Sequence, residues 1–346
     1  MIRAVWQYGI GGIRLHCPVV LLGSQSAPGV DALPDLQRMK TSPLHQSAAA
    51  CFLLPLLFLA VTTGWVKAQA ERSPFTALGQ YRFSTDIDGG GDFSSGRLHF
   101  KGAAPIYRSG ENLIAISAAY GWASYDFSGG GSSSYASYDP WDDLHLINLG
   151  LPVKWSFDGG WDLFLAPGVR WYGENGADFG DAVTVGGIAG FARPFGERLT
   201  LGPGVGVFSQ LEDDASVFPV VLVDWKITDA LSLSTGPTIG ATQGPGLMLN
   251  WDVTDRLRFS AGARYEKHRF RLDGGSGESR DGVGEDRSIP VFGALSLQAG
   301  DHWQLALLGG VAFGSELTIE DRNGRTVSER DTDPSPFVGL SASLRF

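Results

Sequence analysis

Apolar and polar residues alternate along most of the chain after Phe75. Within segments of about ten residues every second side chain is apolar, and stretches rich in Gly, Ser and Asp separate the segments. This period of two is that of a β-strand with one face in an apolar environment. The pattern predicts fourteen strands, at 75–84, 96–107, 112–127, 143–156, 161–172, 182–193, 198–211, 216–227, 231–240, 246–254, 256–272, 288–298, 302–314 and 332–346.

The connections between these strands alternate in length. Short turns are expected at 108–111, 157–160, 194–197, 228–230, 255 and 299–301, and mostly longer loops at 85–95, 128–142, 173–181, 212–215, 241–245, 273–287 and 315–331. Short periplasmic turns, long outer loops and an even strand number are typical of outer-membrane barrels, with both barrel termini periplasmic. The fold class predicted is therefore all-β, a transmembrane antiparallel up-and-down β-barrel. Since the loops at 212–215 and 241–245 are short, a count of twelve strands stays open.

Tryptophan residues recur beside the short turns. The segment 225–236 matches 251–262 at Trp, Thr, Asp, Leu, Ser and Gly, and Trp155, Trp161 and Trp303 flank further turns. Indole rings settle at the membrane–water interface, so this spacing predicts an aromatic girdle. A water-soluble β-sandwich is the alternative, but it explains neither the girdle nor the alternation of turns and loops.

The last strand carries a recognisable ending. Its alternating apolar residues lead to a terminal aromatic, as in the C-terminal strands by which outer-membrane barrels are inserted, and the expected signal is Leu340, Leu344 and Phe346. The partners expected are outer-membrane lipid, lipopolysaccharide and the barrel assembly machinery, and the expected location is the bacterial outer membrane. The sequence does not indicate an oligomeric state.

The first 70 residues are expected to lie outside the barrel. An apolar run from Ala48 to Thr63 and a small-x-small site ending at Ala70 predict a signal peptide over 39–70. A retained anchor is disfavoured because the run is shorter than the roughly 20 residues that a spanning helix needs, and a lipoprotein anchored on Cys51 fits poorly. Residues 1–38 are interpreted as an over-extended start, and 71–346 as the barrel domain.

Removal of these residues leaves a chain without cysteine and with 22 basic against 35 acidic residues, a net charge of −13. Such acidity argues against nucleic acid as a partner. Disulfides and thiolate chemistry are likewise not expected in the mature chain.

Alternation also assigns the two faces of each strand. Over 256–265, Leu257 and Phe259 are expected to face lipid while Arg258 and Arg264 face the lumen. A charge on the lipid face costs about 2–4 kcal/mol at the bilayer midplane, which fixes the register. The strand 216–227 is ambiguous, because Phe218, Val220 and Leu222 fall on its luminal face; either an inner constriction packs there or the register differs.

Several loose patterns of glycine, aromatic and turn residues resemble a family of bacterial outer-membrane barrels known only as a domain of unknown function. They are Leu201-Gly-Pro-Gly-Val-Gly, Glu212-Asp-Asp with Phe218-Pro and Asp224-Trp225, Tyr265-Glu with Arg269-Phe-Arg-Leu272, and Ile289-Pro-Val. The resemblance implies a porin-like barrel over most of 75–346 and carries no activity with it.

Charged side chains on predicted inward faces are the candidate functional residues. Opposed rows of charge in a pore select small polar or anionic solutes, whereas in a filled barrel the same residues would only pair with each other. The luminal candidates are Arg82, Lys101, Lys154, Arg170, Asp224, Lys226, Asp252, Arg258, Arg264 and Glu266, together with Asp162 and Arg345.

The sequence contains no recognisable catalytic, cofactor-binding or metal-binding motif. The histidines His99, His145, His268 and His302 show no triad or ligand spacing, so a hydrolase is disfavoured. Acidic groups expected in outer loops could hold Ca²⁺, but none has an EF-hand spacing; they are Asp86, Asp88, Asp92; Asp139, Asp142, Asp143; Glu212, Asp213, Asp214; and Glu278, Asp281, Glu285, Asp286. The segment 316–331, with Asn323-Gly324 at its centre, predicts a hairpin with a type I′ turn.

Three functions therefore remain in order of preference. The first is a passive or weakly selective channel for small solutes. The second is a closed structural or surface-interaction barrel, and the third an outer-membrane hydrolase. An open lumen favours the first, and a plugged interior with ordered outer loops favours the second.

Overall fold

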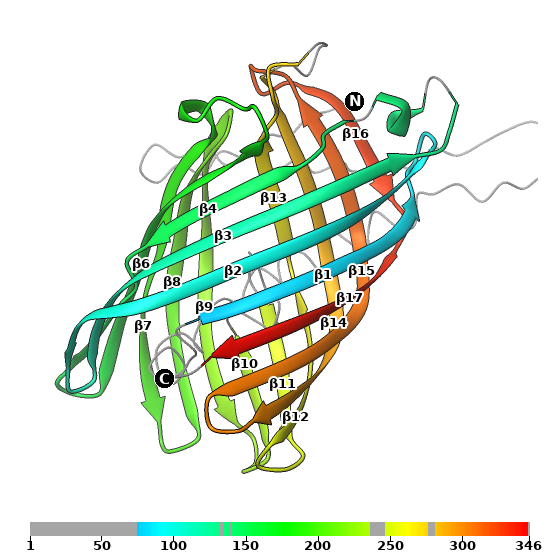
Figure 1. The fold of residues 1–346 in the computed structure, drawn as a ribbon. Coiled ribbons are helices and arrows are strands. Elements are labelled where there is room, and N and C mark those ends of the chain that lie inside the picture. The colour runs from blue at the N-terminus through cyan, green and yellow to red at the C-terminus, as the bar shows by residue number, and fades with distance from the viewer. Residues whose placement is uncertain (1–74, 132–133, 139, 236–245, 276–280, 345–346) are drawn as a thin grey trace, which may run out of the picture. The chain divides into compact units, whose positions relative to one another are not determined.

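The computed structural model describes residues 75–344 except 132–133, 139, 236–245 and 276–280 (Figure 1). The expected signal peptide, the expected N-terminal extension, Arg345 and Phe346 lie outside the described residues. Seventeen β-segments form one sheet, and they are β1 (Phe75–Asp86), β2 (Asp92–Ser109), β3 (Asn112–Ser128), β4 (Leu144–Gly150), β5 (Val153–Phe157), β6 (Trp161–Glu174), β7 (Val183–Phe195), β8 (Leu199–Gln210), β9 (Asp213–Lys226), β10 (Leu231–Thr235), β11 (Gly246–Asp252), β12 (Leu257–Arg264), β13 (Glu266–Arg271), β14 (Val283–Ala299), β15 (Trp303–Glu320), β16 (Thr326–Thr332) and β17 (Ser335–Leu344).

The sheet closes into a barrel. Neighbouring strands around the barrel pair antiparallel, apart from one parallel bridge between β13 and β6, and β1 pairs with β17 from Phe75 opposite Leu344 to Arg82 opposite Phe337. Three of the barrel strands are each interrupted and so consist of two segments; these pairs of segments are β4 with β5, β12 with β13, and β16 with β17. The described residues thus form a 14-strand antiparallel barrel. The prediction of fourteen strands is confirmed, and the alternative of twelve is wrong.

The two ends of the barrel differ, and they are named here by their connections. The turn rim holds the start of β1, the end of β17 and the short turns, with left-handed glycines such as Gly110, Gly159 and Gly300. The loop rim is the opposite end. There, β14 and β15 extend by several residues beyond the predicted strands, to Val283 and Glu320. Polar residues on these extensions resemble a loop in sequence because they lie beyond the apolar part of the wall.

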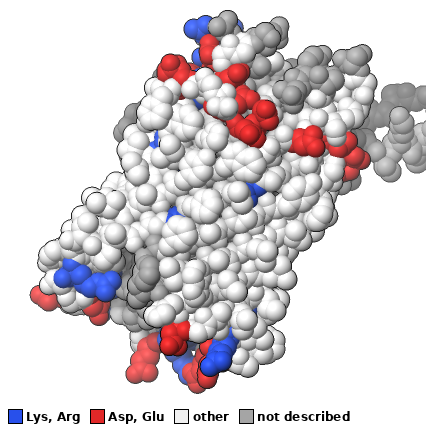
Figure 2. Space-filling model, viewed as in Figure 1, with Lys and Arg blue, Asp and Glu red and all other residues white. Residues whose placement is uncertain are grey.

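The outer wall is apolar between the rims. Large hydrophobic side chains are exposed at every second position, for example Leu305 and Leu307 on β15 and Val338 and Leu340 on β17. Figure 2 shows this on one face, where acidic and basic atoms gather at the two ends and the surface between them is almost uncharged. Exposed tryptophans at the turn rim form the expected girdle; they are Trp161, Trp225, Trp251 and Trp303. This wall matches a bilayer, so the barrel is a transmembrane one.

Helices contribute little. The described residues hold two short 3₁₀ helices, η2 (Tyr135–Tyr138) and η3 (Gly180–Ala182). Within the same residues no helix has the length and apolar character needed to cross a membrane.

The predicted register of β9 is correct. Val220 and Leu222 are fully buried on the inner face, where they pack with Phe164 of β6 and Ala192 of β7. The luminal face of this strand is apolar because it packs in an apolar cluster inside the barrel, and the register that the sequence left in doubt is the predicted one.

The β15–β16 hairpin exists as expected, but its turn is of another type. A type I′ turn needs a positive φ at both central residues. Gly324 has a positive φ of 73°, but Asn323 does not have a positive φ. The Asp321 carboxylate instead accepts hydrogen bonds from the backbone N–H groups of Asn323 and Arg325, at 2.7 and 3.0 Å. A side chain that caps the turn replaces the expected backbone geometry.

Candidate functional site inside the barrel

The predicted luminal residues that the structure describes lie on inward-facing positions. Arg82, Lys154, Arg264 and Glu266 are buried, and Arg170 is partly buried. The other five candidates lie an even number of positions from buried inward-facing residues of the same strand, and so they face inward too; they are Lys101, Asp224, Lys226, Asp252 and Arg258. These candidates do not form one continuous row along the lumen.

Near the turn rim the charged residues pair locally. Lys154 Nζ lies 3.3 Å from Glu111 Oε2 and 3.4 Å from Asp162 Oδ2, and both partners come from neighbouring strand ends. Arg258 forms a two-pronged ion pair with Asp252 on the adjacent strand, at 2.5 and 3.1 Å, and both side chains are exposed. These contacts run along the wall and do not cross the lumen.

Towards the loop rim the contacts cross the interior. Arg97 on β2 lies 2.6 Å from Asp286 Oδ2 on β14 and 3.5 Å from Glu266 Oε2 on β13. Around the sheet, β2 and β13 are separated by β14, β15, β16/β17 and β1. The side chain of Arg97 therefore bridges the barrel from one wall to another.

Further groups complete this crossing network. Glu266 also pairs with Arg264 at 2.7 Å, and His268 Nε2 lies 3.1 Å from Arg97. Asp286 accepts a hydrogen bond of 2.7 Å from the Tyr125 hydroxyl. Of these side chains, those of Asp286, Glu266 and Arg264 are each only 1% exposed, so solvent screens their charges little. We call Arg82, Arg97, Tyr125, Arg264, Glu266, His268 and Asp286 the crossing network.

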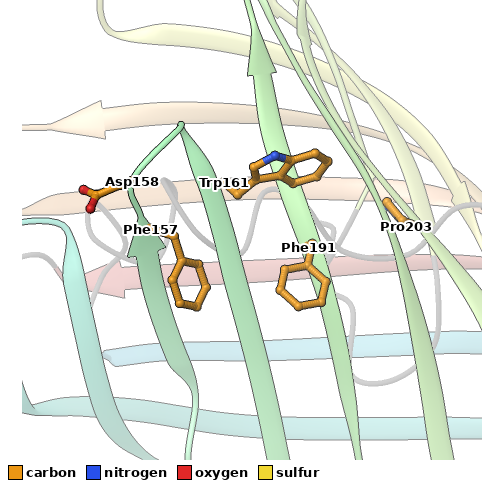
Figure 3. Close-up of a pocket in the computed structure, with 5 residues that line it drawn as sticks. All are labelled: Phe157, Asp158, Trp161, Phe191 and Pro203. Atoms are coloured by element: carbon orange, nitrogen blue, oxygen red, sulfur yellow. The ribbon is translucent and has the colours of Figure 1, made fainter.

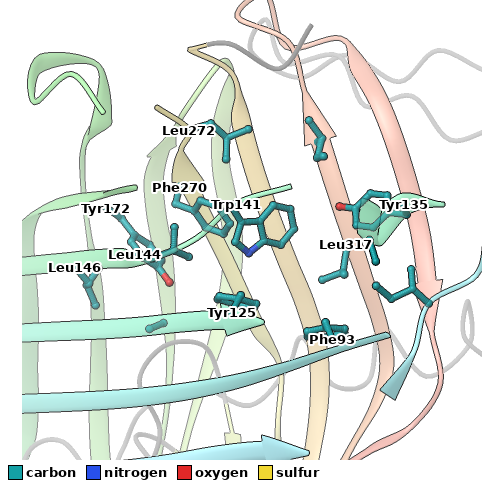
Figure 4. Packing of buried hydrophobic residues seen from close by; sticks show 14 residues of the cluster. Phe93, Tyr125, Tyr135, Trp141, Leu144, Leu146, Tyr172, Phe270, Leu272 and Leu317 are labelled. Carbon is teal, nitrogen blue, oxygen red and sulfur yellow. The ribbon is translucent and has the colours of Figure 1, made fainter. Parts of the chain in front are cut away.

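An aromatic cluster fills the interior beside the crossing network on the side of the loop rim. Trp141, in the loop before β4, lies edge-on to Tyr125 and Phe270 at ring distances of 5.7 and 5.1 Å (Figure 4). It also lies edge-on to Phe127, at 5.3 Å. Its side chain is 1% exposed, and its ring lies among residues from several strands. The cluster comprises Ile87, Phe93, Ala123, Tyr125, Tyr135, Ala136, Trp141, Leu144, Leu146, Tyr172, Phe270, Leu272, Leu317 and Ile319, with Phe127 against it.

Strand β13 makes this closure possible. The pairing with β14 is interrupted between Ala263 on β12 and Glu266 on β13, and Arg271 forms a single parallel bridge with Gly173 of β6. The outer face of β13 is fixed by arginines: Arg269 binds Glu320 and the carbonyl of Leu211, and Arg271 binds Glu212. The strand is thus held between β14 and the β8–β9 turn while its other face enters the interior.

The sequence did not indicate the central members of this site. Glu285 and Asp286 were assigned to an outer loop, which is wrong: both lie in β14, and Asp286 is buried. Arg97 lay inside a predicted strand, at alternating positions with His99 and Lys101, and this inward run was the available signal. The sequence predicts a loop at 128–142 but does not indicate that it folds inward, and in the structure its Trp141 is buried inside the barrel.

The histidines do not form a catalytic site among the described residues. His145 lies on the outer wall, where Tyr120 and His145 Nδ1 share a hydrogen bond of 2.9 Å. His268 belongs to the crossing network, and His99 is buried on β2. The described part of the chain contains no group of three His, Cys, Asp or Glu side chains placed to hold a metal ion.

A shallow apolar depression lies near the turn rim. Its lining is Phe157, Asp158, Trp161, Phe191 and Pro203 (Figure 3). Phe157, Trp161 and Phe191 are exposed on the outer wall, so the depression faces lipid. It is a feature of the lipid-facing surface and adds nothing to the luminal site.

Known proteins resemble the chain in fold only. No family model matches it, and no curated protein matches its sequence, so the resemblance to a family of unknown function stays a prediction. An outer-membrane channel from Pseudomonas putida F1 is 11% identical with a TM-score of 0.44, over 79% of this chain and 95% of its own. A FadL homologue from Pseudomonas aeruginosa is 13% identical with a TM-score of 0.44, over 83% and 98%. Outer membrane phospholipase A from Escherichia coli is 14% identical with a TM-score of 0.35, over 82% and 99%.

Proposed function

We propose that the protein is an outer-membrane channel for small polar or anionic solutes, and that its interior is closed near the loop rim in the conformation described. Both barrel termini are periplasmic in this proposal, with the loop rim outside the cell. The short turns and the apolar wall support that orientation.

The crossing network is the observation that carries the proposal. A barrel that serves only as a structural wall can fill its interior with apolar side chains, because replacing buried ion pairs by packed hydrophobic residues is often neutral or stabilising. Ionisable side chains inside a membrane protein commonly mark the path of a solute or ion. Arg82, Arg97 and Arg264 are therefore the residues that support a solute pathway, and this pathway is closed while they pair with Asp286 and Glu266.

The closed structural barrel remains the second candidate, and the aromatic cluster favours it. Trp141, Phe270 and Tyr125 are at most 4% exposed, and the Trp141 ring packs edge-on against the other two inside the barrel. In this alternative the ordered loop rim is the working surface. For a hydrolase the described residues offer no assembled site.

Single-channel conductance of the full chain in a planar bilayer separates the two candidates. The channel predicts brief conducting events in the wild type, and an open probability at least about tenfold higher in Trp141→Ala, because a loss of roughly 1.4 kcal/mol from the closed state shifts its population that far and Trp→Ala in a core costs about 3–5 kcal/mol. Trp303→Ala, on the lipid-facing wall, is the matched control and leaves the events unchanged. A folded Trp141→Ala barrel that never conducts contradicts the channel and supports the structural barrel.

A further inference from the structure

The Asp286 carboxylate lies in a site built from cationic and hydroxyl donors. Its Oδ2 accepts hydrogen bonds from Arg97 at 2.6 Å and from the Tyr125 hydroxyl at 2.7 Å, and Arg82 approaches its Oδ1 at 3.4 Å. Charge-assisted bonds of this kind are the strongest that a carboxylate forms in a protein. The donors surround a carboxylate as they would surround one carried by a solute.

These donors are positioned by groups other than Asp286. Arg82, Arg97 and Tyr125 come from β1, β2 and β3, three adjacent strands on one wall, whereas Asp286 comes from β14. The guanidinium of Arg82 also donates to the hydroxyls of Ser315 and Ser335.

Aromatic rings fix the same donors further. The guanidinium of Arg82 lies 4.7 Å from the ring centre of Phe93, and that of Arg97 lies 5.7 Å from that of Tyr125. Cation–π contacts of desolvated arginines contribute to holding them in place. The donor site is therefore preorganised on one wall, and Asp286 occupies it from another.

The charge around the site favours an anion. Two guanidinium groups, Arg82 and Arg97, face the carboxylate of Asp286, whereas the Glu266 carboxylate, 3.5 Å from Arg97, is also paired with Arg264 at 2.7 Å. The inward face of β2 continues from Arg97 to Lys101. An arriving carboxylate that replaced Asp286 would form the same bonds that Asp286 forms, so the exchange conserves most of the interaction energy. It would also release the contact that joins β14 to β1, β2 and β3 across the interior.

We propose that Arg82, Arg97 and Tyr125 form a binding site for the carboxylate of a small organic anion, and that Asp286 occupies this site in the closed barrel. The inference rests on the proposed function for the route by which the anion arrives, but the binding itself needs no transport. Occupation of the site by the anion releases Asp286 and favours the open barrel.

Chemical rescue tests the site. The full chain with Asp286→Ala is refolded from urea into detergent, in sodium acetate and in sodium chloride at equal ionic strength, and its unfolding temperature is read from heat-modifiable gel migration. Removal of one partner of a buried pair leaves the guanidinium groups uncompensated. We expect acetate to raise the unfolding temperature of the variant by about 5–10 °C over chloride, with saturation, and to leave the wild type unchanged.

Matched variants identify the cause of the rescue. Arg97→Gln combined with Asp286→Ala lacks one guanidinium group and should lose the acetate effect, while Arg258→Ala at the turn rim should show none. Equal unfolding temperatures in both salts overturn the inference, as does equal rescue of the double variant. Failure of Asp286→Ala to fold in either salt, while Asp286→Asn folds, also overturns it. None of these outcomes depends on conductance, so the inference and the channel can fail separately.

Discussion

The two halves of the barrel interior use the same charged residue types in opposite ways. Towards the loop rim, Arg97 on β2 reaches across the interior to Asp286 on β14 and Glu266 on β13, and the side chains are almost fully buried. Near the turn rim, Arg258 pairs with Asp252 on the adjacent strand, and both remain exposed. One arrangement crosses the lumen and the other follows its wall.

This difference separates residues that close the barrel from residues that only line it. A pair between adjacent strands adds little stability, because water screens exposed charges and two long side chains must be ordered. A buried pair between opposite walls is costly to break, because each freed charge remains in a poorly solvated interior. Whether an inward-facing arginine closes the barrel or only lines it therefore depends on which strand carries its acidic partner.

The largest expected effect is the loss of Arg97. Arg97→Ala leaves Asp286 and Glu266 with one cation fewer in the interior, and we expect unfolding to become easier by about 3–5 kcal/mol in a urea titration. Arg258→Ala is the matched variant at the turn rim, with an expected loss of at most about 1 kcal/mol. Similar losses for the two variants would contradict the distinction between crossing and lining contacts.

A core substitution near the turn rim should separate stability from closure. Leu222 is fully buried in the apolar cluster with Phe164 and Val220, so Leu222→Ala is expected to cost about 2–5 kcal/mol. Because this cluster packs residues of β6, β7 and β9 on one side of the barrel, we expect the open probability in a planar bilayer to stay at its wild-type value. Leu222→Met serves as the volume-conserving control. An increase in open probability equal to that of Trp141→Ala would show that closure depends on general stability.

The fold could be predicted from the sequence because the bilayer imposes a simple rule. Each spanning strand must present apolar residues such as Leu305 and Leu307 at alternate positions, so strand number and facing can be read from local patterns. The same rule predicts inward faces for the ten luminal candidates. The rule does not apply beyond the membrane, which explains why the sequence predicts a loop where the structure has the loop-side end of β14.

The centre of the site could not be predicted, because no local pattern encodes contacts across the lumen. Arg97 and Asp286 are 189 residues apart in the chain, and their meeting depends on barrel closure and on the inward path of β13. Asp286 stands among acidic neighbours that are typical of a solvated loop, and Trp141 follows a Gly- and Ser-rich stretch. Alternation indicates whether a side chain faces the lipid or the lumen, but it does not indicate which residue lies across the lumen from it.

The smallest expected effect concerns the β15–β16 turn, which extends the comparison to a charged group outside the interior. The backbone N–H of Arg325 and then that of Asn323 hold the pKa of the Asp321 carboxyl below its ordinary value. Because the pKa is lower in the folded state, the ionised carboxylate stabilises the turn at pH values above the ordinary carboxyl pKa. This contribution is lost below about pH 4, as the pH falls through the lowered pKa. We therefore expect the Asn323 and Arg325 amides to exchange faster at pH 3 than intrinsic acid rates explain. Asp321→Asn keeps a side-chain acceptor but cannot titrate, so its exchange should follow the intrinsic rates throughout. Because the turn lies apart from the crossing network, we expect the conductance of the barrel to stay unchanged over the same pH range. A conductance that changes with pH in the wild type but not in Asp321→Asn would contradict this expectation, because it would show that the hairpin contributes to closing the barrel.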